Sequence, residues 1–130
     1  GLMPTRILAD TNFLLIPERF KVDIFDVSAD AVNDLTEFYV SSRVLDEIQH
    51  LKENAKPSFF RELRIAETFA GMCTFIVDPS DNDVDDSLVS LALREGMVLG
   101  TSDAELRQKA RAAGVKVLYL RQKSYLVLDG

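Results

Sequence analysis

Short apolar segments with strand character alternate with longer segments of helical periodicity along the whole of this 130-residue chain. The expected strands are 5–10, 37–41, 73–77, 97–100 and 115–120, with 125–128 as a further candidate. The expected helices are 42–54, 59–71, 84–94 and 104–113, with an irregular helical pattern over 22–34. Such alternation builds βαβ units, and these units form a mostly parallel sheet with helices on both faces. The sequence therefore predicts one α/β domain over residues 1–130, with about five strands in its sheet.

Three residues are expected to mark the ends of these elements. Pro17 should end the apolar stretch before it, because proline cannot donate the backbone hydrogen bond of a helix interior. Ser42 should cap the helix over 42–54, and Gly71 should end the helix over 59–71.

Gly1-Leu2 precedes a methionine, and we expect this dipeptide to be a cloning remnant.

The net charge of −6 argues against a nucleic-acid partner, because phosphate binding usually needs a basic surface. A group of carboxylates that holds cations reverses this reasoning, because the bound ions invert the local charge. No apolar run reaches the roughly 20 residues that cross a bilayer. The single cysteine, Cys73, excludes an internal disulfide. We therefore expect a cytoplasmic protein with no membrane partner.

Acidic residues fall where the expected strands end. Asp10 closes the first strand, and Asp103 follows the fourth. Asp85 and Asp86 open the helix between the third and fourth strands, and Glu47 lies near the start of the helix after the second. Ligands of such sheets bind outside the carboxyl ends of the strands, where the strand order reverses. The topology therefore brings acids from distant parts of the sequence towards one edge of the sheet.

This group of acids favours a metal-dependent reaction. Clustered carboxylates repel one another and lose solvation on burial, so they need a compensating positive charge. The segments that carry them hold no lysine or arginine next to the acids, and oxygen ligands suit Mg²⁺ or Mn²⁺. Such ions lower the pKa of a bound water and polarise a phosphoryl oxygen. Hydrolysis of a phosphodiester is the reaction class that follows.

Four segments resemble the motifs of the PIN-domain nuclease family, in the order and at the separations of that family. They are Ile7–Asn12, Val44–Ile48, Asp85–Val89 and Gly100–Leu106. Together with Leu118–Lys123, they look most like archaeal PIN proteins related to small-subunit rRNA-processing nucleases and VapC-type toxins. The resemblance covers essentially the entire chain. It implies a three-layer α/β/α sandwich, a metal-dependent endoribonuclease that uses Mg²⁺ or Mn²⁺, and frequent dimerisation.

The resemblance also implies a role for each site residue. The catalytic and metal-binding set is Asp10, Glu47, Asp86 and Asp103, in which Glu47 either holds metal or orients the attacking water. Asp85 competes with Asp86 for the third place, because the two acids are adjacent. The residues that would bind substrate or support the carboxylates by hydrogen bonding are Asn12, Asp85, Thr101 and Ser102.

Purely structural roles are also open to these acids, since each is a common turn, cap or solvated helix residue. A catalytically silent RNA-binding or scaffold module in a ribonucleoprotein complex is the alternative function. Within the nuclease hypothesis, the sequence does not separate rRNA processing from toxin activity. The corresponding partners are RNA with ribosome-assembly proteins in the first case, and RNA with an antitoxin in the second.

Overall fold

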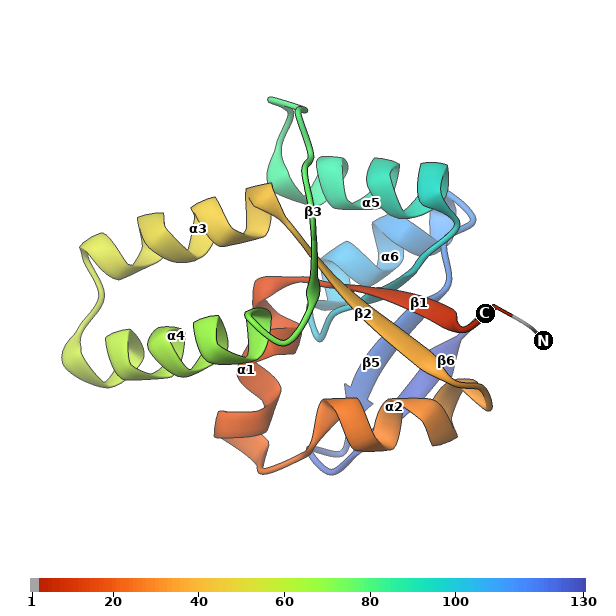
Figure 1. The fold of residues 1–130 in the computed structure, drawn as a ribbon, viewed down its shortest axis with the longest axis horizontal. Helices are drawn as coiled ribbons and strands as arrows, with labels where there is room; N and C mark the ends of the chain where they lie inside the picture. The colour runs from red at the N-terminus through yellow and green to blue at the C-terminus, as the bar shows by residue number, and fades with distance from the viewer. Residues whose placement is uncertain (1–2) are drawn as a thin grey trace.

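A six-stranded sheet with the order β3-β2-β1-β4-β5-β6 runs through the middle of the computed structural model, which describes residues 3–130 (Figure 1). The strands are β1 (Thr5–Ala9), β2 (Thr36–Ser41), β3 (Thr74–Ile76), β4 (Val98–Gly100), β5 (Val117–Arg121) and β6 (Tyr125–Asp129). The first five are parallel, and β6 returns antiparallel to β5. The mostly parallel α/β sheet is thus confirmed, with six strands where about five were expected. The expectation for Gly1-Leu2 lies outside the described residues.

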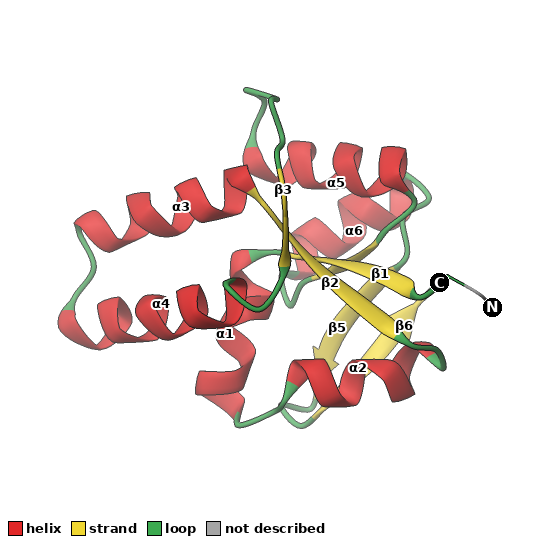
Figure 2. Ribbon diagram, in the orientation of Figure 1, coloured by secondary structure: helices red, strands yellow, loops and turns green. Residues whose placement is uncertain are grey.

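Six helices cover the two faces of this sheet, as Figure 2 shows. They are α1 (Thr11–Phe20), α2 (Ile24–Val32), α3 (Ser42–Glu53), α4 (Pro57–Ala70), α5 (Val84–Glu95) and α6 (Ala104–Ala112). On one face, the Phe38 ring of β2 packs 4.8 Å from the ring of Phe25 in α2 and 6.5 Å from that of Phe13 in α1. Helices α5 and α6 pack along β4 and β5 on the other face. The arrangement is the three-layer α/β/α sandwich.

Helix α1 was not expected from the sequence. Pro17 lies inside this helix, which continues to Phe20, so the prediction that Pro17 ends the segment is wrong. An interior proline costs about 3 kcal/mol. Burial of one large apolar side chain contributes roughly 1.5–3 kcal/mol, and four consecutive ones in α1 are buried. These are Phe13, Leu14, Leu15 and Ile16. Their burial outweighs the missing hydrogen bond.

The strand order reverses between β1 and β4, which lie side by side in the sheet with Ala9 opposite Gly100. The chain leaves β1 directly into α1 and leaves β4 through a short loop into α6. Both connections therefore start at the same edge of the sheet, at the position where α/β proteins bind their ligands. No helix within residues 3–130 has the length and apolar character that a bilayer span requires.

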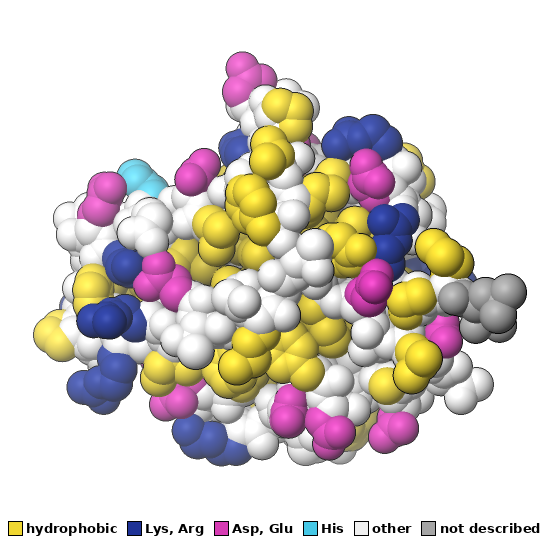
Figure 3. All heavy atoms as spheres, viewed as in Figure 1, with side chains coloured by type: hydrophobic (Ala, Val, Ile, Leu, Met, Phe, Trp, Pro, Cys, Tyr) yellow, Lys and Arg dark blue, Asp and Glu magenta, His cyan; other side chains and the backbone are white. Residues whose placement is uncertain are grey.

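Strand β3 lies at one edge of the sheet, two strands away from β1. Phe75 and Val77 are 54 % and 65 % exposed. Figure 3 shows apolar side chains across the middle of the face on which β2 and β3 lie, with charged side chains towards its rim. The centre of this face is therefore mainly apolar.

Close packing at that edge depends on Gly100. A Cβ atom placed on Gly100 would lie 3.1 Å from ring carbons of Phe13, which is closer than ordinary van der Waals contact, so the ring would have to move by a few tenths of an ångström. We predict that Gly100→Ala lowers the free energy of unfolding by about 1–3 kcal/mol, because the overpacked ring must shift. Urea denaturation measures this change. In a Phe13→Leu background the penalty should shrink to less than half, and an unchanged penalty there would contradict the proposed contact.

Candidate functional site

Asp10 lies at the junction of β1 and α1 and is 4 % exposed. It caps α1: its Oδ1 accepts a hydrogen bond from the backbone N–H of Phe13 at 2.7 Å. The hydroxyl of Thr101, in the loop after β4, donates to Oδ2. Thr101 is itself fully buried. One carboxylate thus connects both strands at the point where the strand order reverses.

Burial raises the pKa of Asp10 to about 7, against an ordinary value of 3.8. The hydrogen bonds from Thr101 and from the Phe13 backbone oppose this rise, because they stabilise the charged form. The negative charges of Glu47 and Asp85 add to it. Carboxylates from β1, α3 and α5 are therefore within electrostatic reach of one another.

Glu47 comes from α3, which begins directly after β2. The capping residue is Ser41, whose Oγ accepts from the Val44 N–H at 3.3 Å, so the expectation of Ser42 as the cap is wrong by one position. The side chain of Glu47 is half-buried, and its Oε1 accepts a hydrogen bond from the hydroxyl of Thr11 at 2.5 Å. Thr11 was not among the expected site residues. The only feature of the sequence that could have indicated Thr11 is its position directly after Asp10. A threonine in a helix is otherwise read as a structural residue.

Asp103 caps α6 and completes the group at this edge. Its Oδ1 accepts from the backbone N–H groups of Glu105 at 2.8 Å and Leu106 at 3.2 Å. The backbone N–H of Asp103 donates to Thr101 Oγ1 at 3.0 Å, while the same hydroxyl donates to Asp10. A single buried hydroxyl therefore fixes the relative positions of Asp10 and Asp103.

The adjacent acids at the start of α5 have different surroundings. Asp85 is half-buried, and its pKa is raised mainly by burial, then by the charges of Asp103 and Asp83; Lys109 lowers it and Glu47 raises it further. Asp86 is exposed, and its Oδ1 lies 3.3 Å from the ammonium of Lys109 on α6. Asp85 therefore interacts with the other site acids, whereas Asp86 forms an ion pair on the outer side of α5 and α6.

Of the polar residues expected to support the carboxylates, only Thr101 bonds to one of them. Asn12 and Ser102 are exposed, and across residues 3–130 neither side chain makes a hydrogen bond to a site acid. The structure thus connects Asp10 to Asp103 through Thr101 and holds Glu47 on Thr11, and Asp85 lies within electrostatic reach of Asp10, Glu47 and Asp103. Asp86 stands apart from this group.

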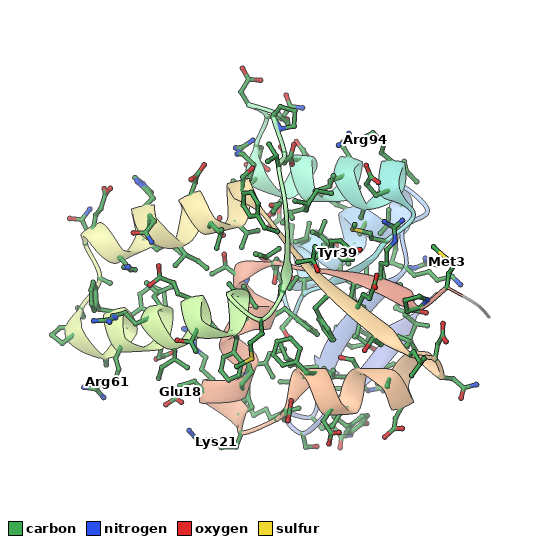
Figure 4. The ribbon with its side chains drawn as sticks, viewed as in Figure 1. Met3, Glu18, Lys21, Tyr39, Arg61 and Arg94 are labelled. Atoms are coloured by element: carbon green, nitrogen blue, oxygen red, sulfur yellow. The ribbon has the colours of Figure 1, made fainter. Side chains whose placement is uncertain are left out.

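The group carries little positive compensation. In the part of the chain that the structure describes, no Lys, Arg or His forms an ion pair with Asp10, Glu47, Asp85 or Asp103. Figure 4 shows cationic side chains such as Lys21, Arg61 and Arg94 at the periphery of the molecule. Four carboxylates and two hydroxyls form a donor set of oxygen atoms only. This chemistry fits a hard divalent cation such as Mg²⁺ or Mn²⁺.

The four acids do not form a ready-made set of ligands. Among residues 3–130, no three His, Cys, Asp or Glu side chains stand close enough together to ligate one ion. Mutual repulsion of carboxylates favours such spacing. A shared ion would therefore need side-chain movements, and Glu47 has freedom for them because Thr11 holds only one of its two oxygens in a side-chain hydrogen bond.

Comparison with known proteins gives a consistent result over nearly the whole chain. A family model described as "PIN like domain" matches residues 7–123. Ribonuclease VapC4 of Methanocaldococcus jannaschii is 27 % identical over 128 residues, which cover 96 % of this chain and 97 % of the relative. Ribonuclease VapC9 of Archaeoglobus fulgidus is 29 % identical over 125 residues, which cover 94 % of this chain and 87 % of the relative.

A solved structure shares the fold. The PIN domain endonuclease Utp24 superposes with a TM-score of 0.77 at 21 % sequence identity, over 97 % of this chain and 92 % of that protein. At this identity the likeness concerns the fold alone. It shows that the sheet order and the helix layers described above occur together in another protein.

Proposed function

This chain belongs to the family of PIN like domains, and we propose on that basis that it is a metal-dependent endoribonuclease. The observation that carries the proposal is the approach of four acids to one edge of the sheet: Thr101 connects Asp10 to Asp103, and the charges of Glu47 and Asp85 raise the pKa of Asp10. None of the four acids has an ion-pair partner within residues 3–130. RNA is the proposed substrate because the two archaeal relatives are named as ribonucleases.

We place the divalent ion with Asp10, Glu47, Asp85 and Asp103. We choose Asp85 rather than Asp86 as the ligand from α5, because the charges of Glu47 and Asp103 raise the pKa of Asp85. Asp86 instead pairs with Lys109. Asp103 has one oxygen bound by two backbone N–H groups, and its Oδ2 makes no hydrogen bond within residues 3–130. That oxygen is the one offered to a ligand.

A bound Mg²⁺ or Mn²⁺ supplies Lewis acidity, which lowers the pKa of a water and stabilises charge on the leaving oxygen. The protein contributes orientation. Thr101 and the Phe13 N–H fix the Asp10 carboxylate, and Thr11 holds Glu47. The amino termini of α1 and α6 open at the same edge, and their dipoles favour negative charge there. Addition of water across the P–O3′ bond leaves a 3′-hydroxyl and a 5′-phosphate.

The proposal is tested by incubating the protein with 5′-labelled single-stranded and structured RNA. We expect cleavage with Mn²⁺ or Mg²⁺, no cleavage with EDTA, and recovery when metal is restored. The product ends distinguish metal-dependent hydrolysis from cleavage by a ribonuclease of the RNase A type, which leaves a 3′-phosphate. Binding of RNA without cleavage at saturating Mn²⁺ would contradict the proposal and favour a scaffold module.

A further inference from the structure

Arg43 lies in the first turn of α3 and connects this helix to α5. Its side chain is half-buried. One guanidinium nitrogen, Nη1, donates to the carbonyl of Ser80 and to the hydroxyl of Ser87, the latter at 3.1 Å. The other, Nη2, donates to the carbonyl of Asn82 at 2.7 Å. A single cation thus bridges α3, the acidic loop (residues 78–83) and the second turn of α5.

The acidic loop is folded around this guanidinium. Ser42 Oγ accepts from the backbone N–H of Asp78 at 2.8 Å and donates to the Asp78 carbonyl at 3.3 Å, which fixes the start of the loop on α3. Ser80 Oγ accepts from the Asn82 N–H at 3.1 Å. Two loop carbonyls then point at Arg43. The guanidinium therefore holds the loop against α3.

The start of α5 depends on these contacts because it has no cap of its own. Asp83 stands at the N-cap position but makes no side-chain capping hydrogen bond. Helices α1, α2, α3 and α6 each have such a bond. Ser87, which is 1 % exposed, bonds instead to Arg43 and to Ser80 Oγ at 3.0 Å. A helix start without a capping side chain is less stable than a capped one, so the contacts of Ser87 decide its position.

Each end of this connection lies in the same helix as a proposed metal ligand. Glu47 follows Arg43 by four residues, which places both on one face of α3. Ser87 follows Asp85 by two residues, so their side chains leave α5 in different directions, and a contact at Ser87 acts on Asp85 through the position of the helix. We propose that Arg43 is a positioning residue that sets the separation of the Glu47 and Asp85 carboxylates, and with it the affinity for the divalent ion. This inference rests on the proposed function and gives Arg43 no contact with RNA.

Arg43→Ala tests the proposal through metal binding and local stability. Loss of a residue that orients metal ligands typically weakens binding about 10–100-fold, so we expect at least a roughly tenfold higher Kd for Mn²⁺ in calorimetric titration. The kcat for RNA should fall by a similar factor, while KM stays within about twofold. Amide hydrogen exchange should accelerate over residues 84–88 but not over the capped first turn of α6.

Two further variants control for charge and for folding. Arg43→Lys keeps the charge but cannot form the fork of hydrogen bonds, so it should restore little of the Mn²⁺ affinity. Ser87→Ala removes only the link to α5 and should weaken Mn²⁺ binding in a folded protein, even if Arg43→Ala fails to fold. A raised KM at unchanged Mn²⁺ affinity would overturn the proposal, because Arg43 would then contact RNA.

The proposal would also be overturned by a lower Tm with parental Mn²⁺ affinity, kcat and hydrogen exchange over residues 84–88, because Arg43 would then be a stabilising residue only. Failure of the proposed function has a different signature, in which the parent protein itself neither binds Mn²⁺ nor cleaves RNA. In that case the hydrogen exchange of Arg43→Ala and Ser87→Ala still decides whether Arg43 positions α5.

Discussion

Asp10→Asn is expected to abolish RNA cleavage and, at the same time, to stabilise the metal-free protein at pH 8. The amide has the shape of the carboxylate, and asparagine is as good a helix cap as aspartate, so α1 can still start there. The variant lacks the negative charge that a divalent ion needs. We predict a loss of cleavage rate of about 100-fold or more, at the upper end of what altered metal sites show.

The expected gain in stability follows from the raised pKa of Asp10. Its pKa is about 7 in the folded protein against 3.8 ordinarily, so the folded state prefers the neutral form. The contribution to stability is fully present below pH 3.8 and is lost as the pH rises through 7. At 1.36 kcal/mol per unit, the ionised carboxylate costs the fold roughly 4 kcal/mol at pH 8. Asparagine removes this cost.

Urea denaturation in EDTA at pH 4 and pH 8 measures the effect. We expect Asp10→Asn and the parent to have similar free energies of unfolding at pH 4. At pH 8 the variant should be more stable by about 2–4 kcal/mol. Asp26→Asn, at an exposed position in the first turn of α2, is the matched control and should change neither cleavage nor the pH dependence. Parental cleavage by Asp10→Asn, or equal stability at both pH values, would contradict the prediction.

The second large effect is expected from the adjacent acids of α5. Asp85→Asn should reduce kcat by about 100-fold, because it removes a proposed metal ligand. Asp86→Asn should leave kcat within about threefold of the parent, since it loses only an exposed ion pair with Lys109, and such pairs contribute about 0–1 kcal/mol. The two variants change the same charge by one unit at neighbouring positions, so each is the control for the other.

Cleavage rates and Mn²⁺ affinity, measured side by side for both variants, decide between the two acids. We expect the cleavage rate and the Mn²⁺ affinity to fall strongly in Asp85→Asn and to stay near the parental values in Asp86→Asn. The reverse pattern would make Asp86 the ligand and require α5 to be rotated from its observed position. Equal losses in both variants would mean that total charge at the start of α5 matters, and not one particular carboxylate.

Sequence patterns predict the sheet well because its strands are short, apolar and separated by helices of clear periodicity. They also place Asp10 and Asp103 at one edge, because Asp10 directly follows β1 and Asp103 follows β4 by three residues, and these strands are parallel neighbours at the reversal of strand order. The existence of α1 could not be predicted in the same way. Its start at Asp10 and its passage through Pro17 depend on the burial of its apolar side chains against β1, β2 and α4.

The choice between Asp85 and Asp86 also lies beyond sequence patterns. Successive residues of a helix differ by about 100° in direction, so the rotation of α5 about its axis decides which of the two side chains faces the other acids. That rotation is set by packing of its buried residues, which are Ser87, Leu88, Leu91 and Ala92. Thr11 and Arg43 escape prediction for a related reason. Thr11 contacts a residue 36 positions away in the sequence, and Arg43 contacts residues 37–44 positions away. No local sequence pattern encodes contacts over such separations.

Diffraction from Mn²⁺-soaked crystals, recorded near the manganese absorption edge, locates a bound ion directly. We predict an anomalous difference peak at the edge of the sheet where β1 and β4 end, within ligand distance of Asp10 and Asp103 and approached by Glu47 and Asp85. A peak held by Asp86 instead, or no peak at this edge at saturating Mn²⁺, would contradict the assignment of these four acids as one metal centre.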